Sequence, residues 1–213
     1  DECFRTLKNA GVNEVYWQGP FSLPEKYQIK CMTMFNMEDS NWHAGILNMA
    51  QFFKKFPEAR AVDFNGGAAK WVDLSYIVEH QETWPLLDKL FYEMKKQNPS
   101  QDIVLWDYEF SPFPGEADLP LYACFSKETL RKFKSEYKIS EEITPQVLKK
   151  KYVEKWVDFR CRELGRVAPI LKKMANSNGM EFAIYSGYQS PETQRLYCVN
   201  WDYVGNGVDK AYI

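Results

Sequence analysis

The sequence predicts an α/β fold, a parallel (β/α) barrel of the TIM type that is incomplete and has about six strands. Short apolar runs alternate along the chain with helical segments of ten or more residues, which is the pattern of βαβ units around a parallel sheet. Polar and aromatic residues collect where the apolar runs end, as in barrels whose chemistry lies at the carboxyl ends of the strands. Neither a G-x-G-x-x-G turn nor a P-loop follows the first run, which disfavours the doubly wound nucleotide-binding alternative.

The first half of the chain supplies three of the predicted strands. Helices are recognised from apolar residues three or four positions apart, strands from short apolar runs, and their ends from glycine and proline. Gly11 stops the first helix, Pro57 closes the second, and Asn65–Gly66–Gly67 ends the third strand. In chain order these signals predict a helix over 2–9, strands over 12–18 and 29–35, a helix over 42–56, a strand over 59–64, and one or two helices over 73–97.

The second half of the chain opens where Asn98–Pro99 breaks the preceding helix. Ser126 and Thr144–Pro145 are helix-start signals, the second with proline at the first helical position. Gly179 ends the long helix that follows. The predicted elements are a strand over 102–110, helices over 126–137 and 144–176, a strand over 181–185, a helix from 190, and a strand over 210–213.

The length of the chain sets the domain organisation. With 213 residues, the chain is long enough for one substantial core, so residues 1–213 are expected to form a single barrel domain of the catalytic type. A complete eight-stranded barrel needs about 250 residues. The prediction of about six strands therefore makes the chain a fragment of a longer protein. A sheet that does not close leaves two open edges, through which self-association with another copy is expected.

Charge and composition exclude several partners and cofactors. The formal net charge is −2 and the basic residues are scattered along helical segments, so neither nucleic acid nor an anionic membrane is an expected partner. No apolar run reaches the roughly 18 residues that span a bilayer. Five widely spaced cysteines and two histidines contain no C-x-x-C pair, so no metal and no other cofactor is expected, and each cysteine is interpreted as a small buried hydrophobe. They do not decide the compartment.

The most informative stretch is the predicted strand Asp102-Ile-Val-Leu-Trp-Asp-Tyr-Glu109, which ends in two carboxylates separated by one residue. Because strand side chains alternate, Asp107 and Glu109 are expected to point the same way. Two neighbouring carboxyl groups cannot both ionise freely, and one is pushed toward the neutral form that donates a proton in general-acid catalysis. The alternative is that both carboxylates cap the strand and bond to the loop that follows it.

This strand end resembles the fourth strand of the (β/α)-barrel glycoside hydrolases, and its Asp-aromatic-Glu-aromatic order is similar to the D-x-x-D-x-D-x-E signature of the chitinase-like members. Asp102, Asp107 and Glu109 match that signature, while Leu105 stands where it has an aspartate. A larger clan of these enzymes has Asn-Glu here, and Tyr108 stands in place of its asparagine. The resemblance implies that the acidic pair lies on the fourth strand and that, in that clan, the nucleophile lies on a seventh strand outside this chain.

What the resemblance implies agrees with the chemistry of glycosidic bond cleavage, which needs one protonated carboxyl group and a second group opposite it. Glu109 is the expected proton donor. Asp107 is a helper rather than the nucleophile, because two neighbours on one strand face lie too close together to act across the bond. The alternative function is a barrel that binds a glycan or a protein partner without cleaving it, with Glu109 buried against a basic side chain such as Arg160 or Arg162.

The expected ligand is a carbohydrate. Phe, Trp and Tyr make up 16% of the chain, and flat apolar rings provide surfaces on which sugar faces can lie. Aromatic residues within helical patterns are assigned to the core instead: Phe52, Phe53, Phe91, Trp156 and Phe159. The residues predicted to bind the substrate lie at strand ends or in loops: Trp17, Gln18, Asn36, Asp63, Asn65, Tyr185, Tyr188, Gln189 and Trp201.

Overall fold

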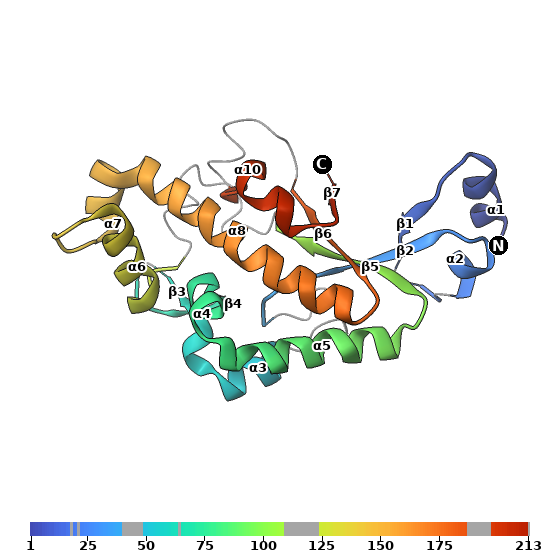
Figure 1. The fold of residues 1–213 in the computed structure, drawn as a ribbon, viewed down its shortest axis with the longest axis horizontal. Coiled ribbons are helices and arrows are strands. Elements are labelled where there is room, and N and C mark those ends of the chain that lie inside the picture. Colours follow the sequence, from blue (N-terminus) through green and yellow to red (C-terminus); the bar gives the residue numbers. More distant parts are fainter. Residues whose placement is uncertain are drawn as a thin grey trace.

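The fold was analysed in a computed structural model that describes residues 1–17, 19–20, 22–39, 49–63, 65–108, 124–186 and 197–212. Its main sheet has five strands in the order β1-β2-β5-β6-β7, and every neighbouring pair is parallel (Figure 1). The sheet is curled, so the structure confirms an α/β fold with an incomplete barrel of the TIM type. The strands are β1 (Glu14–Tyr16), β2 (Lys30–Phe35), β5 (Gln101–Asp107), β6 (Glu181–Tyr185) and β7 (Lys210–Tyr212).

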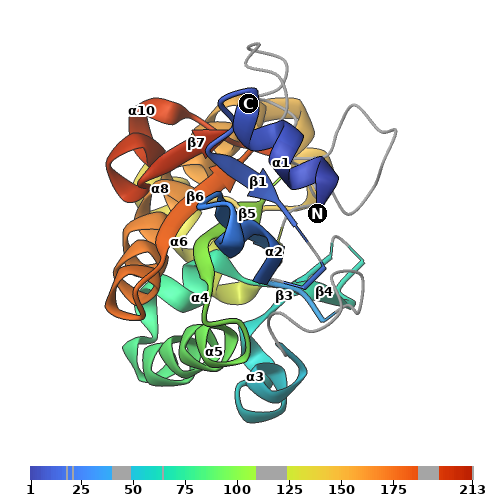
Figure 2. The ribbon, with the colours of Figure 1, turned by 90° about the vertical axis from the view of Figure 1, so that its right-hand side faces the viewer.

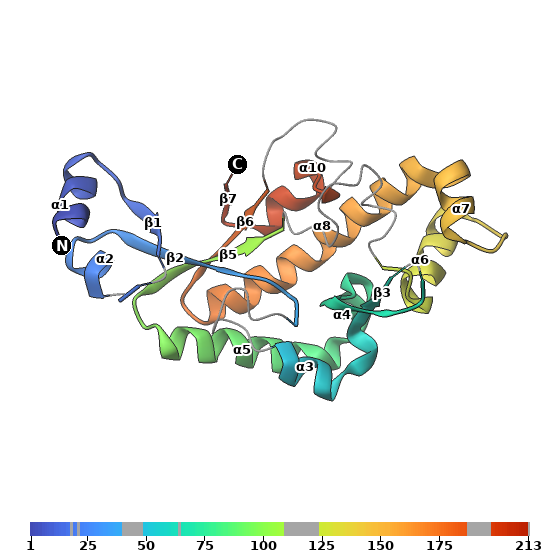
Figure 3. The same ribbon diagram turned by 180° about the vertical axis from the view of Figure 1, so that it is seen from behind.

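The strand predicted over 59–64 is not part of this sheet. Residues Arg60–Val62 form β3, which pairs antiparallel with β4 (Ala68–Val72) in a separate hairpin beside α4 and α6 (Figure 3). The Gly-containing turn that ends β3 joins it directly to a second short strand, the sequence pattern of a hairpin rather than of a βαβ unit. The prediction that the acidic pair lies on the fourth strand is therefore wrong: β5 is the third strand of the parallel sheet.

Within the described residues, most predicted helices are present with small changes at their ends; residues 42–48 of the helix predicted over 42–56 and the start of the helix predicted from 190 lie outside the described residues. The segment predicted over 73–97 is two helices, because Pro85 in the first turn of the second favours a new helix start there. Short α2 was not predicted, and a π-helical turn over Leu148–Tyr152 interrupts the segment predicted over 144–176. The helices are α1 (Glu2–Asn9), α2 (Ser22–Lys26), α3 (Met49–Lys55), α4 (Leu74–Glu79), α5 (Trp84–Gln97), α6 (Lys127–Tyr137), α7 (Pro145–Val147), α8 (Val153–Ser177) and α10 (Trp201–Val204).

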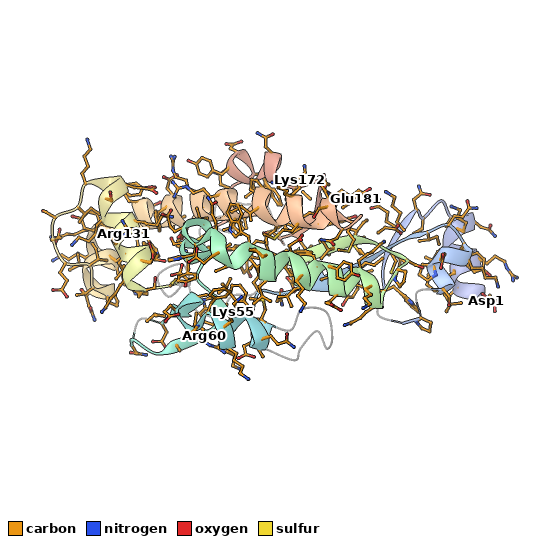
Figure 4. All side chains as sticks on the ribbon, turned by 60° about the horizontal axis from the view of Figure 1, so that its bottom comes forward. Asp1, Lys55, Arg60, Arg131, Lys172 and Glu181 are labelled. Carbon is orange, nitrogen blue, oxygen red and sulfur yellow. The ribbon has the colours of Figure 1, made fainter. Side chains whose placement is uncertain are left out.

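Helices α5 and α8 cover the convex face of the sheet (Figure 1). Alternate strand residues such as Phe35, Trp106 and Phe182 pack there against Phe91 of α5 and Leu164 of α8. A second, smaller core lies between α6 and α8, toward the end of the long axis that carries Arg131 and opposite the end that carries Asp1 (Figure 4). The five aromatic residues assigned to packing are confirmed as core, at most 3% exposed. Of the five cysteines, Cys3 is exposed and does not fit its assignment.

The concave face of the sheet is apolar in its middle and charged at the amino ends of the strands. Met32, Ile103, Leu105 and Ala183 form the apolar layer. Below it, the charged residues that begin four of the strands form an ionic cluster: Glu14, Lys30, Glu181 and Lys210. The sheet curls enough to bring its outer strands β1 and β7 toward each other (Figure 2). Within this cluster Glu181 contacts Lys30 at 2.5 Å and Lys210 at 2.9 Å, Lys210 also contacts Glu14, and Tyr212 donates to Glu14 at 2.6 Å.

The ionic cluster stabilises the fold in a pH-dependent way. The hydrogen bond from Lys30 holds the pKa of Glu181 below its usual value. Burial raises the pKa of Glu14, but hydrogen bonds from Lys210 and Tyr212 outweigh this and lower it overall. A carboxyl group whose folded-state pKa is lowered contributes stability that is present above its unfolded pKa and lost as the pH falls through its folded pKa. The contribution of the cluster is therefore complete at neutral pH.

Lys210→Met is expected to lower the melting temperature at pH 7 by about 2–4 °C, since partly exposed ion pairs contribute up to about 1 kcal/mol in total. The difference from the parent protein should shrink as the pH falls toward 3, because both carboxyl partners become protonated as the pH approaches their lowered pKa values. Thermal melts followed by circular dichroism between pH 3 and pH 8 measure this. Lys173→Met, at an exposed position of α8, is the control. A difference that grows as the pH falls would contradict the prediction.

Candidate functional site

Four residues line up in a row along the carboxyl ends of β2, β5, β6 and β7. Asp107, Tyr185 and Tyr212 are direct partners in the register of neighbouring strands, and Asn36 follows Phe35, whose partner is Trp106. Asp107 shares its face of β5 with Ile103 and Leu105, so its side chain belongs to the concave side. This row, Asn36-Asp107-Tyr185-Tyr212, is the candidate site.

Backbone and amide contacts hold the row together. With the Asn36 amide oriented so that its nitrogen faces the nearby acceptors, this nitrogen donates to the backbone oxygens of Asp107 and Phe35, both at 2.8 Å. The Tyr108 N–H donates to the Tyr185 oxygen at 3.1 Å, so the backbone pairing of β5 with β6 continues past Asp107. The Asp107 carboxylate, the Asn36 side-chain oxygen and the Tyr185 phenol lie side by side on this concave rim and are groups of the kind that bind a ligand rich in hydroxyl groups, while the Tyr212 hydroxyl donates to Glu14.

Asp107 lies at the carboxyl end of a central parallel strand, with Asn36 and Tyr185 beside it, and the roles expected for these residues stay predictions. Four of the other predicted site residues lie outside the described part of the chain: Gln18, Glu109, Tyr188 and Gln189.

Asp63 and Asn65 do not lie at the end of a strand of the main sheet. The Asp63 carboxylate accepts the backbone N–H groups of Asn65 and Gly67, both at 2.8 Å, and so closes the turn between β3 and β4. Gly66 in this turn has φ +84°, a conformation that glycine adopts without steric cost. These residues therefore shape the hairpin. They do not lie at the barrel rim, because β3 is not a strand of the main sheet.

Two predicted aromatic contacts pack within the protein. Trp17 follows β1, donates from Nε1 to the Pro20 oxygen at 3.0 Å, and meets the Phe4 ring edge-on with centroids 4.9 Å apart. Trp201 begins α10 and packs, partly buried, against the main core. Both rings have protein contacts that account for their positions.

Tyr16 and Tyr212 are concave-face residues that the sequence analysis did not select. Tyr212 joins the row at β7, and Tyr16, on the same face of β1 as Glu14, is 37% exposed. Strand periodicity was the available signal: Glu14 and Tyr16, and Lys210 and Tyr212, are spaced by two residues and so share a face.

Behind the row, on the convex side, lies a buried polar network that no sequence motif announced. Asp73 caps α4 by accepting from Ser75 N at 2.9 Å, and it also accepts the hydroxyl groups of Ser126 and of Thr129, the latter at 2.8 Å. A second part of the network runs from the Ser75 hydroxyl to Glu163 and from Glu163 to Arg160.

The Arg160–Glu163 pair is almost completely removed from water, with both residues at most 3% exposed. Burial raises the pKa of Glu163 to about 7, although the positive charge of Arg160 acts in the opposite direction. Burial by itself lowers the pKa of Arg160, but the Glu163 carboxylate outweighs it and keeps the guanidinium charged. Arg162, the other basic residue named as a candidate partner, is largely exposed and pairs with Asp158 at 2.8 Å.

The described residues contain neither a metal site nor a membrane-spanning helix. No group of three or more His, Cys, Asp or Glu side chains in these ranges has the arrangement of a metal site. Among the helices described, none combines the length and the apolar character that crossing a bilayer requires.

Comparison with known proteins gives a likeness of fold. No protein-family model matches the chain, and no curated protein matches it. Among solved structures, it is similar to the catalytic domain of β-amylase from Paenibacillus polymyxa, a glycoside hydrolase with a TIM barrel, at a TM-score of 0.56 and 11% sequence identity. The match covers 98% of this chain and 70% of that chain. The chain therefore has a fold of the kind found in a glycoside hydrolase catalytic domain.

Proposed function

We propose that this chain is a carbohydrate-active hydrolase domain that cleaves glycosidic bonds, with Glu109 as proton donor and Asp107 as its helper. The position of Asp107 carries the proposal: it is a carboxylate at the carboxyl end of a central parallel strand, beside Asn36 and Tyr185 on the concave face. This is where the catalytic groups of TIM-type barrels lie. The likeness to the β-amylase catalytic domain supports the same class of reaction.

The roles follow from the chemistry of the reaction. The leaving oxygen needs a proton from a carboxyl group that is still neutral near neutral pH. A second carboxylate two residues away in the sequence favours that neutral form by repulsion between like charges. Asp107 would hold the acid in place or receive a hydrogen bond from the sugar, and Asn36 and Tyr185 would supply further hydrogen-bonding groups along the rim.

Glycan hydrolysis by the 213-residue chain tests the proposal, with soluble starch, β-glucan and chitin oligosaccharides as substrates and reducing-end release as the measurement. Asp107→Asn is expected to lower kcat by about 10- to 100-fold, because the amide cannot carry the negative charge that assists the acid. Asp102→Asn is the matched control, since Asp102 lies at the other end of β5, where it accepts from Cys31 N at 3.1 Å. Full turnover by Asp107→Asn would remove Asp107 from the site.

A barrel that binds glycans without cleaving them is the second candidate, favoured by the same row of hydrogen-bonding side chains. It predicts binding to at least one of these glycans with no bond cleavage, and loss of that binding in Asp107→Asn. Isothermal titration calorimetry with the same panel separates the two functions.

A further inference from the structure

Arg160 is a buried cation with one N–H group, on Nε, that has no hydrogen-bond acceptor among the described residues. It is 3% exposed, and its Nη1 donates to Glu163. A guanidinium group carries five N–H donors, and buried donors are normally satisfied because an unpaired one costs free energy. Stabilisation of Glu163 alone therefore does not account for this arginine.

The surroundings of Arg160 come from the chain segments next to the candidate site. Its charge acts on Tyr108, the residue that leaves β5 directly after Asp107, and on two buried thiol groups, Cys124 and Cys198. Tyr108 and Cys124 bracket residues 109–123, which follow β5, and Cys198 comes after residues 187–196, which follow β6. Burial raises the pKa values of these three side chains, and the buried guanidinium is near enough to them for its charge to act in the opposite direction.

The segment that returns after β5 is tied to the same network. Ser126, two residues after Cys124, donates its hydroxyl to Asp73, and the Phe125 N–H donates to the Val62 oxygen at 2.7 Å. The helix that Asp73 caps supplies Ser75, which bonds to Glu163 and so reaches Arg160. The network therefore connects α4, α6 and α8 at the level of the carboxyl end of β5.

We propose that Arg160 is a positioning residue of the candidate site, which fixes the chain where it leaves β5 and β6 and thereby sets the geometry of the strand-end groups. The inference rests on the proposed function for its catalytic consequence. Arg160 touches no reacting atom; it acts through Glu163 and Ser75 on the segment that Ser126 ties to Asp73. A catalytic group displaced by about 1 Å loses on the order of 100-fold in rate. The titratable groups around the Arg160–Glu163 pair are Asp73, Tyr108, Cys124, Lys132, Cys161, Arg166 and Cys198.

The test compares three variants of the 213-residue chain. Arg160→Lys keeps the charge but loses the planar fork, and the double variant Arg160→Met with Glu163→Gln removes the pair without leaving a buried charge alone. Arg162→Met is the control, because Arg162 lies on the same helix with its side chain 46% exposed and paired to Asp158. The double variant is expected to lose at least tenfold in kcat with KM within about threefold, and Arg160→Lys to retain part of the activity.

Hydrogen exchange measured by mass spectrometry supplies a readout that does not need hydrolysis. The amides of Tyr108, Phe125 and Ser186 bond to backbone oxygens at the ends of these segments. In the double variant they should exchange at least tenfold faster, while amides inside β5 keep their rates. Arg162→Met should change neither kcat nor exchange.

The outcomes separate this inference from the proposed function. If the parent chain cleaves no glycan, the proposed function fails, and exchange alone then decides whether Arg160 fixes these segments. Unchanged exchange at the three amides would overturn the inference. Faster exchange throughout the chain, or an unchanged kcat in a folded and active double variant, would also overturn it, because Arg160 would then be a structural residue only.

Discussion

Glu109→Gln is expected to nearly abolish glycan hydrolysis, with kcat lower by about 100- to 10,000-fold, while the fold and the glycan affinity stay close to those of the parent protein. The amide keeps the size and shape of the carboxyl group but has no proton to transfer to the leaving oxygen. General acid catalysis contributes about 100- to 10,000-fold, so its loss should dominate the kinetics. Reducing-end release measures kcat, and calorimetry measures the dissociation constant.

An activated substrate sharpens this test. Nitrophenyl glycosides have leaving groups that depart without a proton, so Glu109→Gln should retain much of its activity on them if Glu109 is the acid. Glu142→Gln, at an exposed position, is the control and should behave as the parent. Equal losses on natural and activated substrates would assign Glu109 another role, and equal turnover by variant and parent would remove it from catalysis.

Asp73→Ala is expected to destabilise the fold by about 3 kcal/mol or more, which for a chain of this size lowers the melting temperature by about 6–12 °C. The carboxylate is fully buried and accepts from Ser75 N and from the hydroxyl groups of Ser126 and Thr129. Alanine leaves these donors without an acceptor in a place that water does not reach, and each unsatisfied buried donor costs about 1–3 kcal/mol.

Asp73→Asn should fall between alanine and the parent, because its single carbonyl oxygen satisfies only part of the donor set. Asp202→Ala, an exposed residue in the first turn of α10, is the control and should change the melting temperature by less than about 2 °C. Urea unfolding gives the free energies directly. A cost below about 1 kcal/mol for Asp73→Ala would mean that water reaches Ser126 and Thr129 once the carboxylate is gone.

The similarity of the fold to a β-amylase catalytic domain indicates which substrates to test first. A barrel-type sheet similar to a β-amylase catalytic domain supports a search among glycans, but one fold supports many chemistries, so the site has to carry the functional argument. In this chain, Asp107 and its neighbours along the rim are the groups that support the proposed hydrolysis. Loss of activity in Asp107→Asn and Glu109→Gln together, with binding retained in the second, would establish a hydrolase.

The sequence by itself determined those features that depend on residues close together in the chain. Ser126 accepts from Thr129 N at 3.0 Å and Thr144 from Val147 N at 3.2 Å, so both predicted helix starts are real caps. The strand predicted over 181–185 is β6, and Gly179, predicted to end the preceding helix, has φ +73°. Alternation along β5 also put Asp107 on the concave face, because a strand repeats every two residues whatever its neighbours are.

Only the tertiary structure decided the features that depend on which distant segments meet. The sequence over 59–64 fits a barrel strand. In the structure β3 pairs with β4 and forms a hairpin instead, so Asp63 does not lie at the rim. The contact of Glu14 with Lys210 joins the first strand to the last across the curled sheet. Arg160 and Arg162 are two residues apart, yet one faces the buried network and the other water, because the packing of α8 against the sheet determines which side chain loses its hydration.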